Sequence, residues 1–214
     1  MIGSRIICVV IGYAFGLFQT GYLYGKQHHI DIREHGSGNA GTTNTLRTLG
    51  FKAGAITFLG DLLKAMAAMF VAWILFKNKY PEIARVLEMY AGLGAVLGHN
   101  FPFYLKFKGG KGIACTSGFI LAFYLPIAPI CLILFIGAVA ITRYVSLGSI
   151  LVVLSFYAQL IVFGQLGYIT SYEGSLPEIY VVGAVFTLLA LFKHRENIKR
   201  LCTGTENKFS REKK

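Results

Sequence analysis

Three short polar segments hold most of the side chains in this sequence that could do chemistry. The first, GSGNAGTTNTLR at residues 36–47, is rich in glycine, serine, threonine and asparagine and ends in an arginine. Its glycines permit sharp turns and expose backbone N–H donors. Arg47 could bind a phosphate bidentately, and Asn44 or Thr45 could cap the following helix. Because glycine-rich loops are common, a plain re-entry loop explains this segment better than an anion site when it is taken alone.

The second segment, HNFPFYLKFKGGKG at residues 99–112, carries glycines and lysines immediately before an apolar stretch. Glycines just before a helix leave N–H groups at its N-terminus, where the helix dipole favours an anion. The pattern of a nucleotide-binding P-loop fails, because Ile113 follows Gly112 and no strand precedes the loop. The alternative is a basic cluster that contacts anionic lipid headgroups.

The third segment, HRENIKRLCTGTE at residues 194–206, follows the last apolar stretch. If that helix continues, His194 and Asn197 share one face, and Arg195 and Lys199 lie on another. A positively charged membrane anchor explains the lysines. It does not require a histidine paired with an asparagine.

The elements that must position these segments are membrane helices. The chain of 214 residues is 55% hydrophobic and 14% charged, whereas a soluble domain carries about 25% charged residues. Several apolar stretches approach or exceed the roughly 20 residues that cross a bilayer. The sequence therefore predicts an all-α membrane protein, a seven-transmembrane helical bundle that forms a single domain over residues 1–214. The predicted helices are 3–25, 46–76, 84–104, 112–125, 127–142, 145–166 and 177–192.

The distribution of charge predicts how this bundle is oriented. With seven spans, sixteen of the 21 lysines and arginines fall on one side. The positive-inside rule then places the N-terminus outside and the C-terminus in the cytoplasm. All three polar segments share the cytoplasmic side, and residues 210–214 form a polar tail. If the prolines between residues 125 and 129 only kink a helix, the count falls to six.

The net charge of +11 has this same one-sided distribution. It therefore indicates an anionic lipid leaflet rather than a nucleic acid as the partner.

Asp61 and Lys64 lie three residues apart inside the second predicted span. Charges within a membrane are costly and usually face the bundle interior in pairs. We expect a structural pair, and our hypothesis is that it orders the helix behind Arg47.

The four cysteines show no metal-ligand spacing. Cys8 and Cys131 lie in apolar runs, where cysteine behaves as a small hydrophobic residue. We therefore expect no metal, no cofactor and no disulfide.

Together the three segments resemble, in order and spacing, the signature motifs of the membrane-integral acyl-phosphate:glycerol-3-phosphate acyltransferases, the PlsY family. Those motifs look like G-S-G-N-x-G-x-T-N-x-x-R, H-x-F-P-x-[FY]-x-x-F-K-G-G-K-G and H-R-x-N-I-x-R-L-x-x-G-x-E, and they cover 39 residues here. Ala40 stands where the family often has proline, and Cys115 where threonine is common. The resemblance also implies seven spans, an outward N-terminus and a cytoplasmic active site in a bacterial inner membrane.

The resemblance implies that a fatty acyl group passes from acyl phosphate to the 1-hydroxyl of glycerol-3-phosphate, giving lysophosphatidic acid and phosphate, the first acylation of phospholipid synthesis. The partners are these two substrates and membrane lipids, with no nucleic acid. Catalytic roles fall on Ser37, Lys111, His194 and Asn197. Substrate-binding roles fall on Gly38, Asn39, Thr43, Asn44, Arg47, His99, Lys108, Gly109, Gly110, Gly112, Arg200 and Glu206.

We assign the loop at residues 108–112 to acyl phosphate. Glycerol-3-phosphate is assigned to Arg47 and the four catalytic residues, with Lys111 able to reach both substrates. Residue chemistry alone permits either acyl phosphate or acyl-CoA as the donor.

The mechanism is expected to depend on positioning. No Ser/His/acid triad is visible, and Tyr104 stands where an H-x-x-x-x-D box would need its acid. Because phosphate is a good leaving group, orientation and oxyanion stabilisation could suffice, with a substrate phosphate oxygen taking the hydroxyl proton. In the alternative, His194 is the general base. Its basic surroundings favour a neutral histidine, and we favour a binding role.

Two other classes of protein compete with an enzyme. A transporter for a phosphorylated solute predicts charged or broken helices at mid-membrane, and only Asp61 and Lys64 meet that description. A structural lipid-binding protein explains the basic tail. It does not explain the polar residues Ser37, Asn39, Asn44 and Asn197.

Overall fold

The computed structural model describes residues 2–170 and 172–209, and these residues form helices and turns without a β-strand. The predicted tail at 210–214 lies outside the described residues. The chain divides into two compact units, Met1–Phe123 and Tyr124–Lys214. Within the described residues, five helical segments are long and apolar enough to cross a membrane, and the first of them comprises two helices in succession: Ile2–Gln27, Phe51–Phe76, Leu125–Thr142, Val145–Gln165 and Leu176–Lys193. The predicted all-helical, multi-pass membrane fold is confirmed, whereas the count of seven spans stays a prediction.

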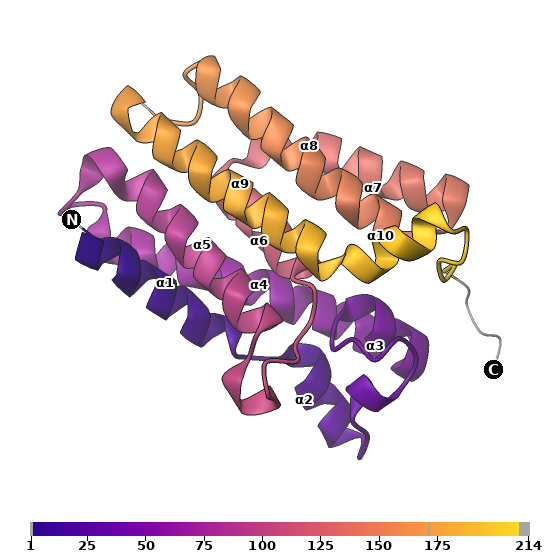
Figure 1. Cartoon of the computed structure of the whole chain (residues 1–214). Coiled ribbons are helices and arrows are strands. Elements are labelled where there is room, and N and C mark those ends of the chain that lie inside the picture. The colour runs from indigo at the N-terminus through magenta and orange to yellow at the C-terminus, as the bar shows by residue number, and fades with distance from the viewer. Residues whose placement is uncertain (1, 171, 210–214) are drawn as a thin grey trace. The chain divides into compact units, whose positions relative to one another are not determined.

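The first unit is built around α1, α4 and α5, which pack side by side (Figure 1). The short helix α3 packs on α4, and α6 packs on both α4 and α5. The helices are α1 (Ile2–Gly16), α2 (Thr20–Gln27), α3 (Thr42–Leu49), α4 (Phe51–Phe76), α5 (Ala84–Asn100) and α6 (Ile113–Phe123).

Glycines bring α1 and α5 into backbone contact. Gly12 lies against the carbonyl of Ala91, and Gly98 lies against the carbonyl of Tyr13, so closely that an added Cβ would overlap either oxygen. Small residues spaced four apart are the usual means by which membrane helices approach this closely, because apolar burial drives little association within lipid. This close contact between α1 and α5 positions the end of α5, and therefore the start of the second polar segment.

Replacing Gly12 with alanine is expected to destabilise the protein by about 1–3 kcal/mol, because the new methyl group has no space against the α5 backbone. Gly3→Ala in the same helix is the matched control, since nothing lies within 4 Å of a Cβ at that position. Thermal unfolding of the purified protein in detergent measures both changes. Equal melting temperatures for the two variants would contradict the close backbone contact between α1 and α5.

The first predicted helix, 3–25, is wrong as a continuous element, because residues 17–19 separate α1 from α2. The side chain of Gln19 fills the break. Its Nε2 donates to the carbonyls of Gly16 at 3.1 Å, Gly98 at 3.2 Å and His99 at 3.1 Å. A break within a membrane is tolerated where side chains satisfy the freed backbone groups in this way.

The second predicted helix, 46–76, is divided into α3 and α4 at Gly50, whose φ is +86°. Only glycine adopts this conformation without strain. The expected cap at Asn44 or Thr45 is also wrong, since α3 starts earlier and has Gly41 as its N-cap. Thr45 instead donates from Oγ1 to the carbonyl of Gly41 at 3.1 Å.

The second unit contains α7 (Ala128–Thr142), α8 (Val145–Gln165), α9 (Leu176–Lys193) and α10 (Arg195–Cys202). Helix α8 packs between α7 and α9, and Phe156 meets Phe186 in the α8–α9 core. The prolines do interrupt the long apolar stretch, because α6 ends at Phe123 and α7 begins at Ala128. Much of the surface of α7 is apolar, as expected of a helix that faces lipid, and its exposed side chains include Leu132, Ile133, Ile136 and Ile141.

Candidate active site

Asn44 ties the first polar segment into a fixed loop. Its Oδ1 accepts from the backbone N–H of Ser37 at 2.7 Å, and its Nδ2 donates to the carbonyls of Ile32 and His35, both at 2.9 Å. Because the buried amide uses both of its ends on the backbone, Asn44 positions Ser37, and its predicted contact with substrate stays a prediction. Ser37 itself is exposed.

The same loop contains the left-handed glycines Gly36 and Gly38, at φ +58° and +70°. A Cβ at Gly36 would overlap the Oδ1 of Asn44, so glycine is needed there for both conformation and space. Asn39 and Thr43 lie half-buried around the turn.

An ion pair just before the first segment, Asp31 with Arg33, contacts the second segment. Asp31 accepts hydrogen bonds from the Arg33 backbone N–H, Nε and Nη2, the last at 2.7 Å. Hydrogen bonding to the Arg33 guanidinium holds the pKa of the Asp31 carboxyl below its ordinary value. Arg33 also donates to the carbonyl of Leu105 at 3.5 Å.

Arg47 lies half-buried on the last turn of α3. Among the residues that the structure describes, it has neither an ion-pair partner nor a hydrogen-bond partner. A half-buried guanidinium with no internal partner is suited to bind an anionic ligand through its five N–H donors.

Two N–H groups of the second segment are already used within the protein. The N–H of Gly109 donates to the carbonyl of Asn100 at 3.3 Å, and that of Gly110 donates to the carbonyl of His99 at 3.1 Å. The expectation that these glycines expose their N–H groups to a ligand is therefore wrong. They instead hold the loop against the end of α5.

The part of this loop that remains suited to an anion is its junction with α6. Gly112 has φ +81° and turns the chain into the helix, which begins at Ile113. The first N–H groups of a helix have no intrahelical acceptor and favour an anion. Lys111 is half-buried beside this junction. Lys108 is exposed and has no ion-pair partner within the described chain.

His99 belongs to a buried polar network in the first unit. Lys64 Nζ donates to the Phe18 carbonyl at 2.6 Å, to Asp61 Oδ1 at 2.7 Å and to His99 Nδ1 at 2.9 Å. Thr20 Oγ1 donates to the same Asp61 oxygen at 3.1 Å. The predicted pairing of Asp61 with Lys64 is therefore confirmed.

The contacts of this pair lead to the break between α1 and α2 and to His99. The lysine side chain is long enough to extend from α4 to α5, so the pair supports the second polar segment. The hypothesis that it also orders the helix behind Arg47 stays a prediction.

Asp61, His99 and Cys115 place their ligand atoms within 4.8 Å of one another, close enough to be considered for a metal ion. The Lys64 ammonium, however, is bonded to both the carboxylate and the imidazole. It already supplies the positive charge that a metal would bring, so this donor set does not fit a resident metal.

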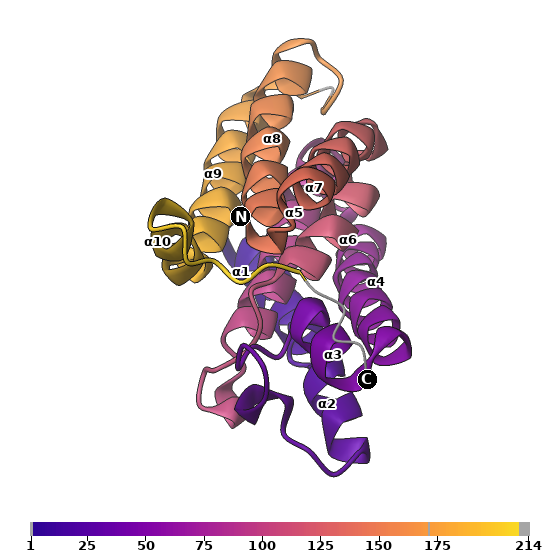
Figure 2. The same cartoon turned by 90° about the vertical axis from the view of Figure 1, so that its right-hand side faces the viewer.

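His194 lies at the junction of α9 and α10, where the helix bends instead of continuing straight (Figure 2). It is buried, and its Nδ1 lies 2.8 Å from the carbonyl of Ala190. A carbonyl oxygen only accepts hydrogen bonds, so Nδ1 carries the proton and Nε2 is the acceptor nitrogen in the neutral ring.

Glu206 holds the rest of the third segment in place. Its Oε1 accepts from Asn197 Nδ2 at 2.8 Å, and its Oε2 accepts from Arg200 Nε at 2.9 Å. Asn197 is thereby oriented by a fixed carboxylate. Glu206 and Arg200 form an ion pair through Arg200 Nε, which positions both side chains, and their predicted substrate-binding role stays a prediction.

The structure therefore groups the predicted residues by unit. The first unit holds the Ser37 loop, Arg47, His99 and the glycine–lysine loop with Lys111, whereas the second holds His194 and the Asn197–Glu206 cluster. Reasoning from sequence did not find Gln19 and Thr20. Their only signal was a pair of polar residues inside the first apolar stretch.

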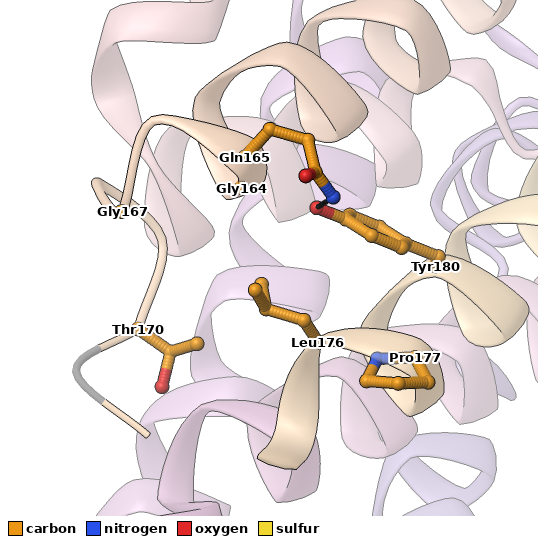
Figure 3. A pocket seen from close by; sticks show the side chains of 7 residues that line it. All are labelled: Gly164, Gln165, Gly167, Thr170, Leu176, Pro177 and Tyr180. Carbon is orange, nitrogen blue, oxygen red and sulfur yellow. Dashed lines mark hydrogen bonds between the residues drawn. The ribbon is translucent and has the colours of Figure 1, made fainter. Parts of the chain in front are cut away.

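A pocket of about 560 Å³ lies where α8 ends and α9 begins (Figure 3). Gln165 Nε2 donates to the Tyr180 hydroxyl at 3.0 Å within it. Its lining includes no cation and no predicted site residue, so it is not a phosphate site. The lining residues are Gly164, Gln165, Gly167, Thr170, Leu176, Pro177 and Tyr180.

Comparison with known proteins gives one consistent family. A family model described as glycerol-3-phosphate acyltransferase matches residues 6–204. The glycerol-3-phosphate acyltransferase of Alkaliphilus metalliredigens is 42% identical, covering 97% of each chain. That of Clostridioides difficile is also 42% identical, covering 98% of each.

Solved structures agree with the sequence relatives. The chain is similar to a crystal structure of PlsY, an integral membrane glycerol 3-phosphate acyltransferase, in its glycerol 3-phosphate form. The TM-score is 0.82 at 32% identity, over 97% of this chain and 96% of that one. The lysophosphatidic acid form of PlsY gives a TM-score of 0.81 at the same identity and coverage. The chain therefore belongs to the glycerol-3-phosphate acyltransferase family of integral membrane enzymes, of the PlsY type.

Proposed function

We propose that this enzyme transfers a fatty acyl group from acyl phosphate to the 1-hydroxyl of glycerol-3-phosphate, giving lysophosphatidic acid and inorganic phosphate. The observation that carries the proposal is that the first unit presents two separate cationic elements. One is Arg47 beside the Ser37 loop, and the other is the glycine–lysine loop at the start of α6. Two substrates that each carry a phosphate require two such elements.

In this proposal the fixed Ser37 loop and Arg47 bind glycerol-3-phosphate. The junction of Gly112 with α6, together with Lys108, binds the acyl phosphate, and Lys111 serves both substrates. The substrate hydroxyl oxygen forms a bond to the acyl carbonyl carbon, and the bond from that carbon to the phosphate oxygen breaks. The helix N-terminus and lysines stabilise the negative charge that develops on the oxygens.

The hydroxyl proton requires an acceptor. The Nδ1–H tautomer of His194 leaves Nε2 able to accept that proton, which supports an acceptor role for this side chain. A phosphate oxygen of a substrate remains the alternative acceptor. Asn197, oriented by Glu206, would bind the substrate next to His194.

The test of the donor uses purified protein in lipidic mesophase with palmitoyl phosphate and glycerol-3-phosphate, following phosphate release and lysophosphatidic acid. Stoichiometric formation of both products by the wild type, but not by Lys111→Ala, is the expected result. Activity with palmitoyl-CoA alone would retain acyl transfer and overturn the acyl phosphate donor. No turnover with either donor would contradict the proposed function.

We propose further that the whole chain acts as one domain with seven spans, an external N-terminus and a cytoplasmic C-terminus in the bacterial inner membrane. The site then faces the cytoplasm. Support comes from the basic third segment and from the two shorter helices, α5 with 17 residues and α6 with 11, which would complete the seven spans.

Cys202 provides a natural probe of this topology, because it is exposed near the end of α10, whereas Cys8, Cys115 and Cys131 are buried. A membrane-impermeant maleimide is expected to label the enzyme in inverted membrane vesicles and to leave it unlabelled in intact spheroplasts. Cys202→Ser should abolish the labelling. Labelling from the outside of spheroplasts would place the C-terminus on the external side.

A further inference from the structure

The network behind His99 has a complete set of hydrogen bonds around one cation. A lysine ammonium has three donors and no acceptor. Lys64 directs them at the Phe18 carbonyl, Asp61 Oδ1 and His99 Nδ1. The three acceptors come from the α1–α2 break, from α4 and from α5, so one ammonium joins three elements of the first unit.

This arrangement determines the state of the imidazole. His99 Nδ1 lies 2.9 Å from the Lys64 ammonium, which only donates, and 3.5 Å from Asp61 Oδ1, which only accepts. The shorter contact, to the ammonium, favours Nδ1 as an acceptor that carries no proton. A doubly protonated ring would place an N–H against the ammonium, which is unfavourable in a buried site. The neutral ring therefore carries its proton on Nε2, the opposite tautomer from that of His194.

The other edge of the ring meets the anion-binding loop. A Cβ at Gly110 would overlap His99 Nε2, and a Cβ at Gly109 would overlap the His99 carbonyl oxygen. The N–H of Gly110 also donates to that same carbonyl at 3.1 Å. The ring and the backbone of His99 thus determine how closely the Gly109–Gly110 turn approaches α5.

We propose that Asp61 and Lys64 are positioning residues that hold His99 as its Nε2–H tautomer. The His99 ring in turn sets the position of the Gly109–Gly110 turn. This turn aligns Lys111 and the start of α6 with the phosphate of the donor. The assignment of the loop to the donor rests on the proposed function. The tautomer and the contact with Gly110 do not.

The chain offers a matched control for this buried ion pair. Arg85 and Glu88 form a second i,i+3 pair, at 3.2 Å within α5, and Glu88 is as buried as Lys64. Arg85 donates to the Phe123 carbonyl at 3.0 Å, at the opposite end of α5 from the loop. Arg85 is partly exposed, so Glu88→Gln reports the cost of disturbing a buried carboxylate whose ion pair does not support the loop.

The first arm of the test observes the tautomer in the resting enzyme. The chain contains five histidines, so the protein labelled with ¹⁵N-histidine gives few ring signals, and His99→Gln identifies those of His99. A protonated Nε2 and an unprotonated Nδ1 are expected in the wild type, with loss of this single state in Lys64→Met. A wild-type His99 protonated on Nδ1, or on both nitrogens, would overturn the proposal.

The second arm is kinetic. Lys64→Met is expected to raise KM for palmitoyl phosphate by roughly 10- to 100-fold, as displacement of a binding loop by a fraction of an ångström does. KM for glycerol-3-phosphate should rise by a smaller factor, because Lys111 is shared by both substrates whereas Arg47, the other cation of that site, is built on α3. Glu88→Gln should lower the melting temperature without changing either KM. Equal kinetic effects of Lys64→Met and Glu88→Gln would overturn the positioning role.

A double variant, Asp61→Asn/Lys64→Met, keeps the test decisive if Lys64→Met does not fold, because it leaves no unpaired buried charge. It removes the donor to His99 and carries the same expected loss of the tautomer and rise in KM. If the wild type turned over no donor, the proposed function would fail, while the ¹⁵N signals of His99 would still decide whether Lys64 holds its Nε2–H tautomer.

Discussion

Arg47→Ala is expected to raise KM for glycerol-3-phosphate by roughly 100-fold, because a bidentate, charge-assisted contact with phosphate contributes about 3 kcal/mol. KM for acyl phosphate should stay within about threefold of the wild type, since its loop does not include α3. Arg47→Lys keeps the charge but loses the fork of N–H donors, and should recover only part of the affinity. Initial rates over a matrix of both substrate concentrations give the two constants.

The control for net charge is Lys52→Ala. Lys52 is exposed at the start of α4, five residues beyond Arg47. The Lys52→Ala substitution removes one positive charge close to α3 without removing a side chain assigned to substrate binding. An equal rise in KM for both substrates in Arg47→Ala would move this arginine out of the acceptor site. A similar loss in Lys52→Ala would point to a diffuse electrostatic effect.

His194→Gln is expected to lower kcat by on the order of 100-fold or more, as removal of a general base does. In the proposed mechanism Nε2 must be unprotonated, so the wild-type rate should rise with pH as the imidazole loses its second proton. The variant should lose this ascending limb. Measurement of kcat from about pH 5.5 to 8.5 tests both effects.

A substrate phosphate also titrates close to pH 6, so an ascending limb in the wild type does not by itself identify the base. The comparison with His194→Gln does. A limb that persists in a slow variant would assign the proton to the substrate phosphate and leave His194 a binding role.

His28→Gln is the matched control for this variant, because His28 also ends a helix and bonds through Nδ1 to the carbonyl four residues earlier, that of Tyr24 at 3.0 Å. It should leave the rate unchanged.

The two histidines assigned to the site show how far sequence reasoning extends. Each lies in a motif whose residue types suggested phosphate chemistry, and the resemblance placed both in the site. Their tautomers could not be inferred from the motifs, because each depends on the partner of Nδ1. For His99 that partner is a lysine 35 residues earlier, and for His194 it is a carbonyl one helical turn away.

The same distinction explains the wrong expectations. Hydropathy indicated a continuous first helix, because Gln19 is one polar residue in a long apolar stretch. The break forms because carbonyls from α5 accept its amide hydrogens, and hydropathy does not register such contacts. Asn44 was expected to cap a helix, but it bonds instead to a loop that folds back over it.

The sequence by itself determined that this is a helical membrane protein with three polar segments suited to phosphate and acyl-transfer chemistry. Apolar composition, charge asymmetry and the types of residue in each motif can be read along the chain without its tertiary structure. Only the tertiary structure decided which groups are available to substrate. It assigned the N–H groups of Gly109 and Gly110 and the charges of Arg200 and Glu206 to internal bonds, and it left Arg47 without a partner in the described chain. The physical reason is that a hydrogen-bonding group is committed by whichever acceptor or donor the fold brings within reach.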